Sequence, residues 1–266
     1  MKHSKTTTNP TKSLQLARRL AEEGYRLFSL NDARKVAEVA NLEIKDMKGA
    51  LASLKAQGWI HALKRDLYFL DSLFLAGIPV HEFEIATHLV TPSTISHYSA
   101  LHYHALTDQI PHIVFATTPT GASLPRISQG DLFTYNGVRY RYSQVKSEHF
   151  FGIEKVWIGE ARIPMTDIER TLLDGLMKPQ YCGGFMEVLA GYSTPREFSI
   201  SKLIEYALRL DISVAKRLGW VLEQVGVEDE GIESLAALPF NGFIKLDPSA
   251  KKMGPYNKRW QIQENI

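Results

Sequence analysis

Three histidines lie close together in the segment ISHYSALHYHALTDQIP, at positions 97, 102 and 104. Imidazole binds metals and acts as a general base near neutral pH, so the segment could hold a metal ion or a catalytic base. If Thr91 caps a helix here and Pro92 is its first residue, His97 and His104 are two turns apart. That is roughly 10 Å along the axis, too far for one ion, and His102 points about 140° away from His97. We predict no metal site, no cofactor and no catalytic residue here, but histidines that pack and form hydrogen bonds.

A second candidate is the acidic segment TDIERTLLDGLMKP. Thr166 and Glu169 have the T-x-x-E spacing of a capping box, and Asp167 suits the positive end of a helix dipole. Arg170 and Asp174 are four residues apart, which allows an ion pair on the helix surface. The phosphate-loop, dinucleotide, serine-hydrolase and zinc-protease motifs are absent. We expect no enzyme, and keep as the alternative a nuclease that uses Asp167, Glu169 and Asp174.

Composition and charge place these residues in an ordinary globular chain with two unlike parts. The chain has 266 residues, of which 44% are hydrophobic and 23% charged. Its single cysteine, Cys182, excludes a disulfide within the chain. The polar start lacks the apolar stretch of a signal peptide and no run of about 20 apolar residues occurs, which predicts a cytoplasmic protein without a membrane span. Residues 1–70 carry 13 Lys and Arg against 7 Asp and Glu, a net charge of +6, whereas the rest has a net charge of −4. This asymmetry indicates that the N-terminal part meets a polyanion.

The basic part has the element order of a winged helix-turn-helix domain. A helix from Lys12 ends at Gly24, and the extended segment YRLFSL follows. A second helix begins after its expected cap, Asn31, and a third covers residues 44–58 with Glu43 as its expected cap. Two apolar runs joined by KRD then predict a hairpin. We assign residues 1–75 to this domain and residues 76–266 to a second one.

In such a domain the third helix enters the major groove of double-stranded DNA and the second helix crosses the backbone. Lysines and arginines on these helices and at the hairpin tip suit phosphate contacts, which position the protein but do not specify a sequence. The third helix lacks Arg, Asn and Gln in its first turns, so its residue types do not favour bidentate base readout. A protein-interaction module is the alternative for this domain. The predicted DNA-binding residues are Arg34, Lys35, Ile44, Lys45, Lys48, Lys64 and Arg65.

The second domain mixes strands and helices. Residues 113–117 read as a buried strand, and Asn136-Gly137 is a strong signal for a type I′ hairpin. Two further strands meet at Gly159-Glu160, and several amphipathic helices follow Pro179. Strands that come before helices predict an α+β fold rather than a wound βαβ sheet.

Three segments in this order, after a winged helix, resemble the AbiEi family of antitoxins. They are ISHYSALHYHALTDQIP, RIPMTDIERTLLDGL with GG shortly after, and KLDPS…GPYNKRWQI. Tyr98 and Ala105 are mild departures from the family pattern. The first motif is matched by Ser99, Ala100, Leu101, His104 and Leu106, and the second by Glu169, Arg170, Thr171, Leu172, Leu173 and Asp174.

The resemblance implies a transcriptional regulator of a type IV toxin–antitoxin operon that acts in abortive infection, a phage defence. The winged helix would bind inverted repeats at the operon's own promoter and repress it. The second domain would counteract a nucleotidyltransferase-type toxin without requiring a stable complex. Neither motif is a known catalytic set, so we assign structural roles to Ser99, His104, Glu169, Arg170 and Asp174.

Overall fold

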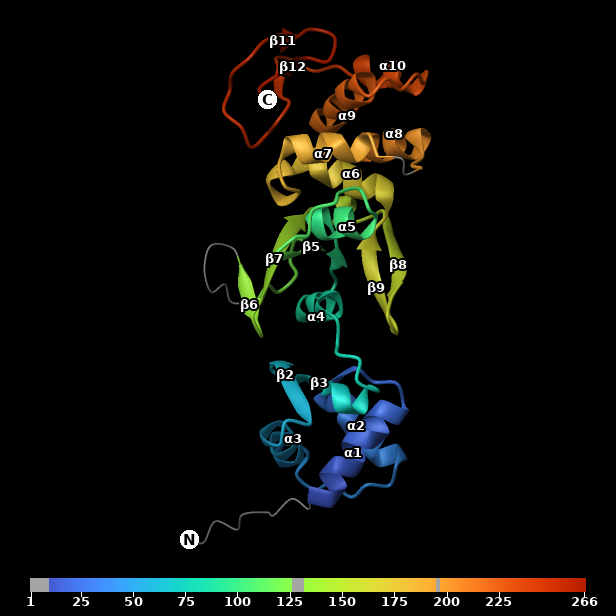
Figure 1. Ribbon diagram of the computed structural model, residues 1–266, viewed down its shortest axis with the longest axis vertical. Coiled ribbons are helices and arrows are strands. Elements are labelled where there is room, and N and C mark those ends of the chain that lie inside the picture. Colours follow the sequence, from blue (N-terminus) through green and yellow to red (C-terminus); the bar gives the residue numbers. More distant parts are fainter. Residues whose placement is uncertain (1–9, 126–131, 195–196) are drawn as a thin grey trace. The chain divides into compact units, whose positions relative to one another are not determined.

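The computed structural model describes residues 10–125, 132–194 and 197–266 (Figure 1). Two compact units divide the chain, the first ending at Ile85 and the second beginning at Ala86. Helices and strands occur in both units, so the protein is of the α+β class. No helix in these residues has the length and apolar character needed to cross a membrane.

The division between the units lies later in the chain than the predicted boundary at residues 75 and 76. Leu75 is buried in the core of unit 1, and Val80 packs against the same core. Arg26 donates a hydrogen bond of 3.0 Å to the carbonyl of Pro79. These contacts tie the segment from Leu75 to Val80 to unit 1.

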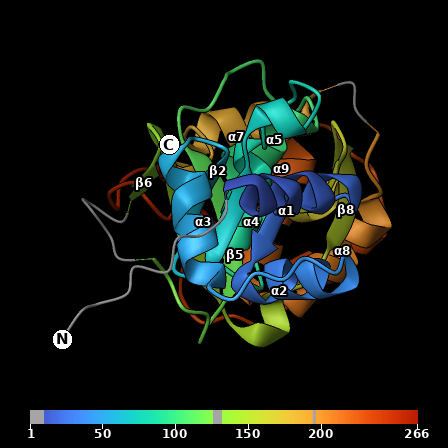
Figure 2. The ribbon, with the colours of Figure 1, turned by 90° about the horizontal axis from the view of Figure 1, so that it is seen from below.

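Unit 1 has the order of elements that the sequence predicted. Its three helices pack on one another (Figure 2). Its strands form an antiparallel sheet in the order β1-β3-β2. Leu16 and Leu20 of the first helix and Leu51 and Leu54 of the third are buried in its core. The elements are α1 (Pro10–Glu22), β1 (Leu27–Ser29), α2 (Leu30–Val39), α3 (Met47–Ala56), β2 (Ile60–Lys64), β3 (Leu67–Leu70) and the 3-10 turn Ser72–Phe74.

Both internal helices of unit 1 begin at caps that differ from the predicted ones. Ser29, not Asn31, caps α2: its hydroxyl accepts from the amide of Asp32, whose carboxylate accepts from the amide of Ser29 at 2.8 Å. The hydrogen bond from the Ser29 hydroxyl lowers the pKa of Asp32. Asp46, not Glu43, caps α3, which therefore begins three residues later than expected. In both helices the cap is the residue immediately before the first helical residue.

The centre of unit 2 is a mixed six-stranded sheet in the order β6-β7-β5-β4-β9-β8. The predicted hairpin at Asn136-Gly137 is confirmed, because both residues have positive φ and the flanking residues Tyr135 and Val138 pair. The expected strands on either side of Gly159-Glu160 are also present. The strands are β4 (Thr94–Ile95), β5 (Val114–Pro119), β6 (Phe133–Tyr135), β7 (Val138–Val145), β8 (Ile153–Ile158) and β9 (Ala161–Thr166).

The long helix expected from Pro92 through the three histidines is wrong. The residues Thr94 and Ile95 form a strand in the middle of the sheet, where Ile95 pairs with Ala116 of β5 and Met165 of β9. Only His97–Tyr103 is helical, as α5. β-Branched residues fit the pleated sheet, and pairing with distant strands overrides the local helical pattern.

Helices and a small three-stranded sheet form the rest of unit 2. Helix α5 contacts both β5 and α6, and the helices from α7 to α10 follow beyond α6 (Figure 1). The indole of Trp260 is fully buried in this core, and a Cβ at Gly219 would collide with it. The remaining elements are α4 (Glu82–Leu89), which spans the unit boundary, α6 (Ile168–Met177), α7 (Phe185–Tyr192), α8 (Ile200–Arg209), α9 (Ile212–Gln224), α10 (Gly231–Ala236), the short strands β10 (Ile244–Lys245), β11 (Tyr256–Asn257) and β12 (Ile262–Gln263), and the 3-10 turns Ser147–His149 and Pro179–Tyr181.

Candidate nucleic-acid interface

The N-terminus of α3 is fixed by a side-chain cap. The Asp46 carboxylate accepts a hydrogen bond of 2.9 Å from the amide of Gly49. A Cβ at residue 49 would collide with this carboxylate, so glycine allows the cap to close. The first amides of a helix carry partial positive charge. The positive end of α3 is therefore held at a defined place on the surface of unit 1.

A groove of about 470 Å³ lies beside this helix end, between α2 and α3. Arg34 of α2, Lys45 before α3 and Lys48 in its first turn all line the groove and are exposed. Within the described residues, none of these three side chains forms an ion pair. The structure thus brings together three of the predicted DNA-binding cations on two neighbouring elements.

Two of the predicted contacts, Ile44 and Lys45, lie at positions that differ from those expected. Ile44 and Lys45 precede α3 instead of lying on it, because the helix begins at Met47. Ile44 lines the groove but also packs against the core of unit 1. The ammonium of Lys12 in α1 donates to the carbonyl of Glu43 at 3.3 Å and so attaches this link to the first helix. Lys45 remains at the groove, whereas Ile44 has a packing role.

The predicted residues at the hairpin tip, Lys64 and Arg65, are both exposed. Asp66 follows them with a φ of 58°, which closes the turn between β2 and β3. Its carbonyl accepts a hydrogen bond of 3.0 Å from the amide of Leu30, the first residue of α2. The Arg65 side chain, 94% exposed, lies 3.7 Å from the Asp66 carboxylate. The hairpin tip is thereby anchored beside the start of α2.

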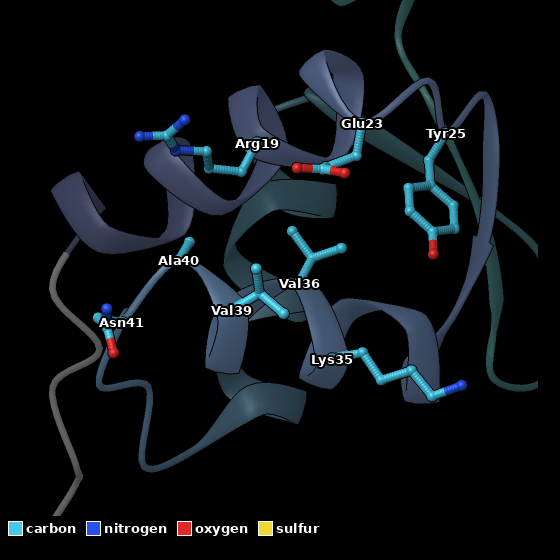
Figure 3. A pocket seen from close by; sticks show the side chains of 8 residues that line it. All are labelled: Arg19, Glu23, Tyr25, Lys35, Val36, Val39, Ala40 and Asn41. Carbon is cyan, nitrogen blue, oxygen red and sulfur yellow. The ribbon is translucent and has the colours of Figure 1, made fainter.

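Lys35 is separated from the other predicted cations. It lines a different groove, of about 430 Å³, between α1 and α2 (Figure 3). Val36 and Val39 supply apolar side chains there, and Val39 is 78% exposed. Arg19 of α1 and Glu23, the residue after that helix, also line this groove, and Arg19 pairs with Glu22 on its own helix. Successive residues of a helix point in directions about 100° apart, so Arg34 and Lys35 serve different faces.

The sequence interpretation missed two acidic residues of the groove between α2 and α3. Glu38 and Asp46 line it together with Arg34, Lys45 and Lys48. The carboxylate of Asp46 is engaged by the cap, which leaves Glu38 as the exposed opposing charge. The preference of aspartate for N-cap positions was the signal that identifies Asp46. The groove carries three cations against two carboxylates, a modest positive excess.

In unit 2 the predicted pair Arg170 and Asp174 forms, but in the interior rather than on the surface. The guanidinium Nε lies 2.9 Å from the carboxylate, and the two side chains are only 1% and 2% exposed. Arg170 also donates to the carbonyl of His149 at 2.8 Å and lies over the ring of Phe151. A Cβ at Gly152, whose φ is +69°, would collide with Arg170. The pair is therefore part of the core.

The predicted capping box of Thr166 and Glu169 is wrong. Asp167 caps α6 by accepting from the amide of Arg170 at 2.8 Å. Glu169 reaches α8 instead, where it accepts from the amide of Ser199 at 2.9 Å and the ammonium of Lys202 at 2.8 Å. Burial raises the pKa of Glu169, but these two donors outweigh it and the net shift is downward. The carboxylates at 167, 169 and 174 all make such structural contacts.

The first motif joins α5 to the sheet. The Ser99 hydroxyl accepts from the amide of Phe115 in β5 at 2.9 Å. The ring of His104 donates from Nε2 to the carbonyl of Thr166 at 2.7 Å. His97 is buried at the start of α5, and burial lowers its pKa to about 4, whereas His102 is exposed. Over the residues that the structure describes, no group of His, Cys, Asp and Glu is arranged to hold a metal ion.

The fold and surface define an α+β protein whose smaller unit presents a cationic groove next to a helix N-terminus. No family model matches the chain. A search of curated proteins also finds no match. The chain is similar to the crystal structure of the RV2827C protein from Mycobacterium tuberculosis, with a TM-score of 0.63 and 13% sequence identity. The match covers 95% of this chain and 91% of that chain, and at this identity it shows the fold alone.

Proposed function

We propose that the chain is a DNA-binding antitoxin that represses its own toxin–antitoxin operon. Unit 1 binds inverted repeats in the promoter as a winged helix-turn-helix domain, and unit 2 counteracts a nucleotidyltransferase-type toxin. The observation that carries the DNA-binding part is the groove between α2 and α3, where Arg34, Lys45 and Lys48 meet the N-terminus of α3. The antitoxin part rests on the resemblance of the motifs in unit 2 to the AbiEi family.

The geometry suits a phosphate backbone more than base readout. Lysine ammonium groups and helix amides bind phosphate oxygens, and such contacts set the register of a protein on the duplex. The hairpin tip carries Lys64 and Arg65 next to the start of α2 and supplies further backbone contacts. Each phosphate contact releases about 0.9 of a condensed counterion and therefore steepens the fall of the binding affinity with salt concentration.

The test is a fluorescence anisotropy titration of the full chain with the DNA upstream of its own gene, at several salt concentrations. We expect tight, salt-sensitive binding at an inverted repeat. The triple variant carries Arg34→Gln, Lys45→Gln and Lys48→Gln. Its plot of the logarithm of the association constant against the logarithm of the salt concentration should be less steep, by about 0.9 for each lost phosphate contact. The matched control neutralises three exposed lysines of unit 2, Lys146, Lys155 and Lys252, and should retain the wild-type slope.

Absence of salt-sensitive binding at any inverted repeat would overturn the repressor proposal. Equal DNA affinity in the triple variant and its control would instead favour a protein-interaction role for unit 1. The antitoxin part is tested separately by co-expression with a nucleotidyltransferase-type toxin. The triple variant should still restore growth, because its substitutions lie outside unit 2. Failure of the wild-type chain to restore growth would overturn that part alone.

A further inference from the structure

A pocket of about 380 Å³ in unit 2 is unrelated to the proposed DNA contacts. It lies along β7 and the turn after α6, and its volume is in the range of small-molecule sites. Four aromatic rings contribute to its wall, and the polar side chains of Ser143 and Lys178 lie among them. The aromatic residues are Phe133, Tyr140, Tyr142 and Tyr181.

Lys178 supplies the charge of this pocket. The residue follows directly after α6, and its ammonium donates a hydrogen bond of 2.8 Å to the hydroxyl of Ser143. Within the described residues no carboxylate lies within ion-pair distance of this ammonium. An ammonium has three N–H donors, so two are left for a ligand. Burial lowers the pKa of Lys178, which means that its charge lacks the solvation that a bound anion would restore.

The nearest buried charges do not neutralise Lys178. Asp174, one turn earlier on α6, favours the charged form of Lys178, but its carboxylate already pairs with Arg170 at 2.9 Å. The ring of His97 is kept neutral by burial, with a pKa of about 4. The cluster of Arg170, Asp174 and Lys178 therefore has a net charge of +1. Of these three side chains, that of Lys178 lines the pocket.

The ring of Tyr181 forms one wall of the pocket and is fixed by neighbouring side chains. The rings of His97 and Phe115 both lie 5.6 Å from it, centroid to centroid. The guanidinium of Arg141 lies 5.1 Å from its centroid, and the Lys178 ammonium 5.5 Å. A ring held from several sides loses little conformational freedom when a flat ligand stacks against it.

We propose that this pocket binds a phosphate monoester of a planar ring compound, such as a nucleoside monophosphate. Its phosphate accepts hydrogen bonds from Lys178, and its ring packs among the aromatic side chains. A lysine ammonium binds phosphate as a point charge. A free nucleotide and the 5′-phosphate end of a nucleic acid share this chemistry.

The experiment is isothermal titration calorimetry of the full chain with AMP, adenosine, inorganic phosphate and a 5′-phosphorylated trinucleotide. We expect AMP to bind, and adenosine and inorganic phosphate to bind about tenfold more weakly, because each lacks half of the contacts. Binding of the trinucleotide but not of AMP would identify a nucleic-acid end as the source. Absence of binding by both AMP and the trinucleotide at millimolar concentration would overturn the proposal.

The matched pair of variants is Lys178→Met and Lys155→Met. Lys155 is an exposed lysine on β8, at the opposite edge of the sheet from β6 and β7. Lys178→Met should weaken AMP binding about tenfold, since hydrogen bonds to a charged group are lost, and Lys155→Met should leave it unchanged. Equal affinities in the two variants would overturn the site. If thermal unfolding shows that Lys178→Met does not fold, Ser143→Ala replaces it, and an unchanged AMP affinity there counts against the proposal.

Discussion

Unit 1 exposes Arg34, Lys45 and Lys48 around a groove, whereas unit 2 buries Arg170 and Lys216 in its interior. The exposed cations have no ion-pair partner in the described part of the chain. The buried ones are satisfied, Arg170 by Asp174 and Lys216 by the carbonyl of Ala236 at 2.7 Å. An exposed charge costs little to keep and is available to a partner, whereas a buried charge is tolerated only with a partner inside the fold.

This difference indicates that the exposed cations of unit 1 serve recognition, whereas the buried charges of unit 2 serve folding. Substitutions at the groove of unit 1 should change recognition and leave folding intact. Substitutions at the buried charges of unit 2 should change folding first. Three predictions test this contrast, in order of decreasing effect on the free energy of unfolding.

The largest effect is expected for Asp174→Ala. It leaves the guanidinium of Arg170, which is 1% exposed, without its counter-charge. Breaking a buried pair in this way costs about 3–5 kcal/mol. Urea unfolding of unit 2, followed through the fluorescence of the buried residues Trp220 and Trp260, measures this loss.

The control for this prediction replaces both partners by apolar residues, as Arg170→Met with Asp174→Leu. The double variant should recover most of the lost stability, because no charge is left buried without a partner. A loss below about 1 kcal/mol in Asp174→Ala would show that this pair behaves like a surface pair and would remove the contrast between the units.

An intermediate effect is expected from the pH dependence of unit 2 through His97. Burial lowers its pKa from 6.5 to about 4; Asp174 opposes this shift, and Lys178 and Arg170 add to it. Between pH 6.5 and about pH 4 the unfolded chain binds more protons than the folded chain, so the free energy of unfolding decreases as the pH falls. The loss attributable to His97 should reach about 3 kcal/mol near pH 4.

This loss is measured as the difference between the wild type and His97→Gln in urea unfolding at pH 7 and pH 4. Glutamine does not titrate, so the variant should depend less on pH while the carboxylates contribute equally to both proteins. If the free energy of unfolding depends on pH equally in the wild type and in His97→Gln, the ring of His97 takes up its proton as easily in the folded state as in the unfolded one.

The smallest effect is expected for the combined substitution Lys45→Gln, Lys48→Gln in unit 1. Both side chains are exposed, so the free energy of unfolding should change by no more than about 0.5 kcal/mol. Thermal unfolding of the double variant and the wild type makes the comparison. A larger loss would indicate that these lysines support α3 and would weaken their assignment to a ligand.

Much of the fold could be predicted from local pattern. The order of elements in unit 1 and the hairpin at Asn136-Gly137 follow from short-range signals, such as apolar spacing and turn residues with positive φ. The failures occurred where distant chain segments decide. Thr94 and Ile95 were expected in a helix but form a strand, because β5 and β9 supply their hydrogen-bond partners on either side.

The candidate groove could be predicted only in part. The positive charge of residues 1–70 and the types of Arg34, Lys45 and Lys48 were evident. That Lys35 belongs to another groove follows from the rotation of α2 and from its packing on α1. The acidic lining by Glu38 was not anticipated, because a helical pattern by itself does not say which neighbouring element a polar side chain faces.

By itself, the sequence determined the α+β class, the charge difference between the two parts of the chain and the four-residue spacing of Arg170 and Asp174. Only the tertiary structure decided that this pair is buried, and that Glu169 binds Lys202 of α8 instead of capping its own helix. The physical reason is that spacing along one helix defines which side chains are neighbours. Whether those neighbours meet water or the core depends on elements that lie far away in the chain.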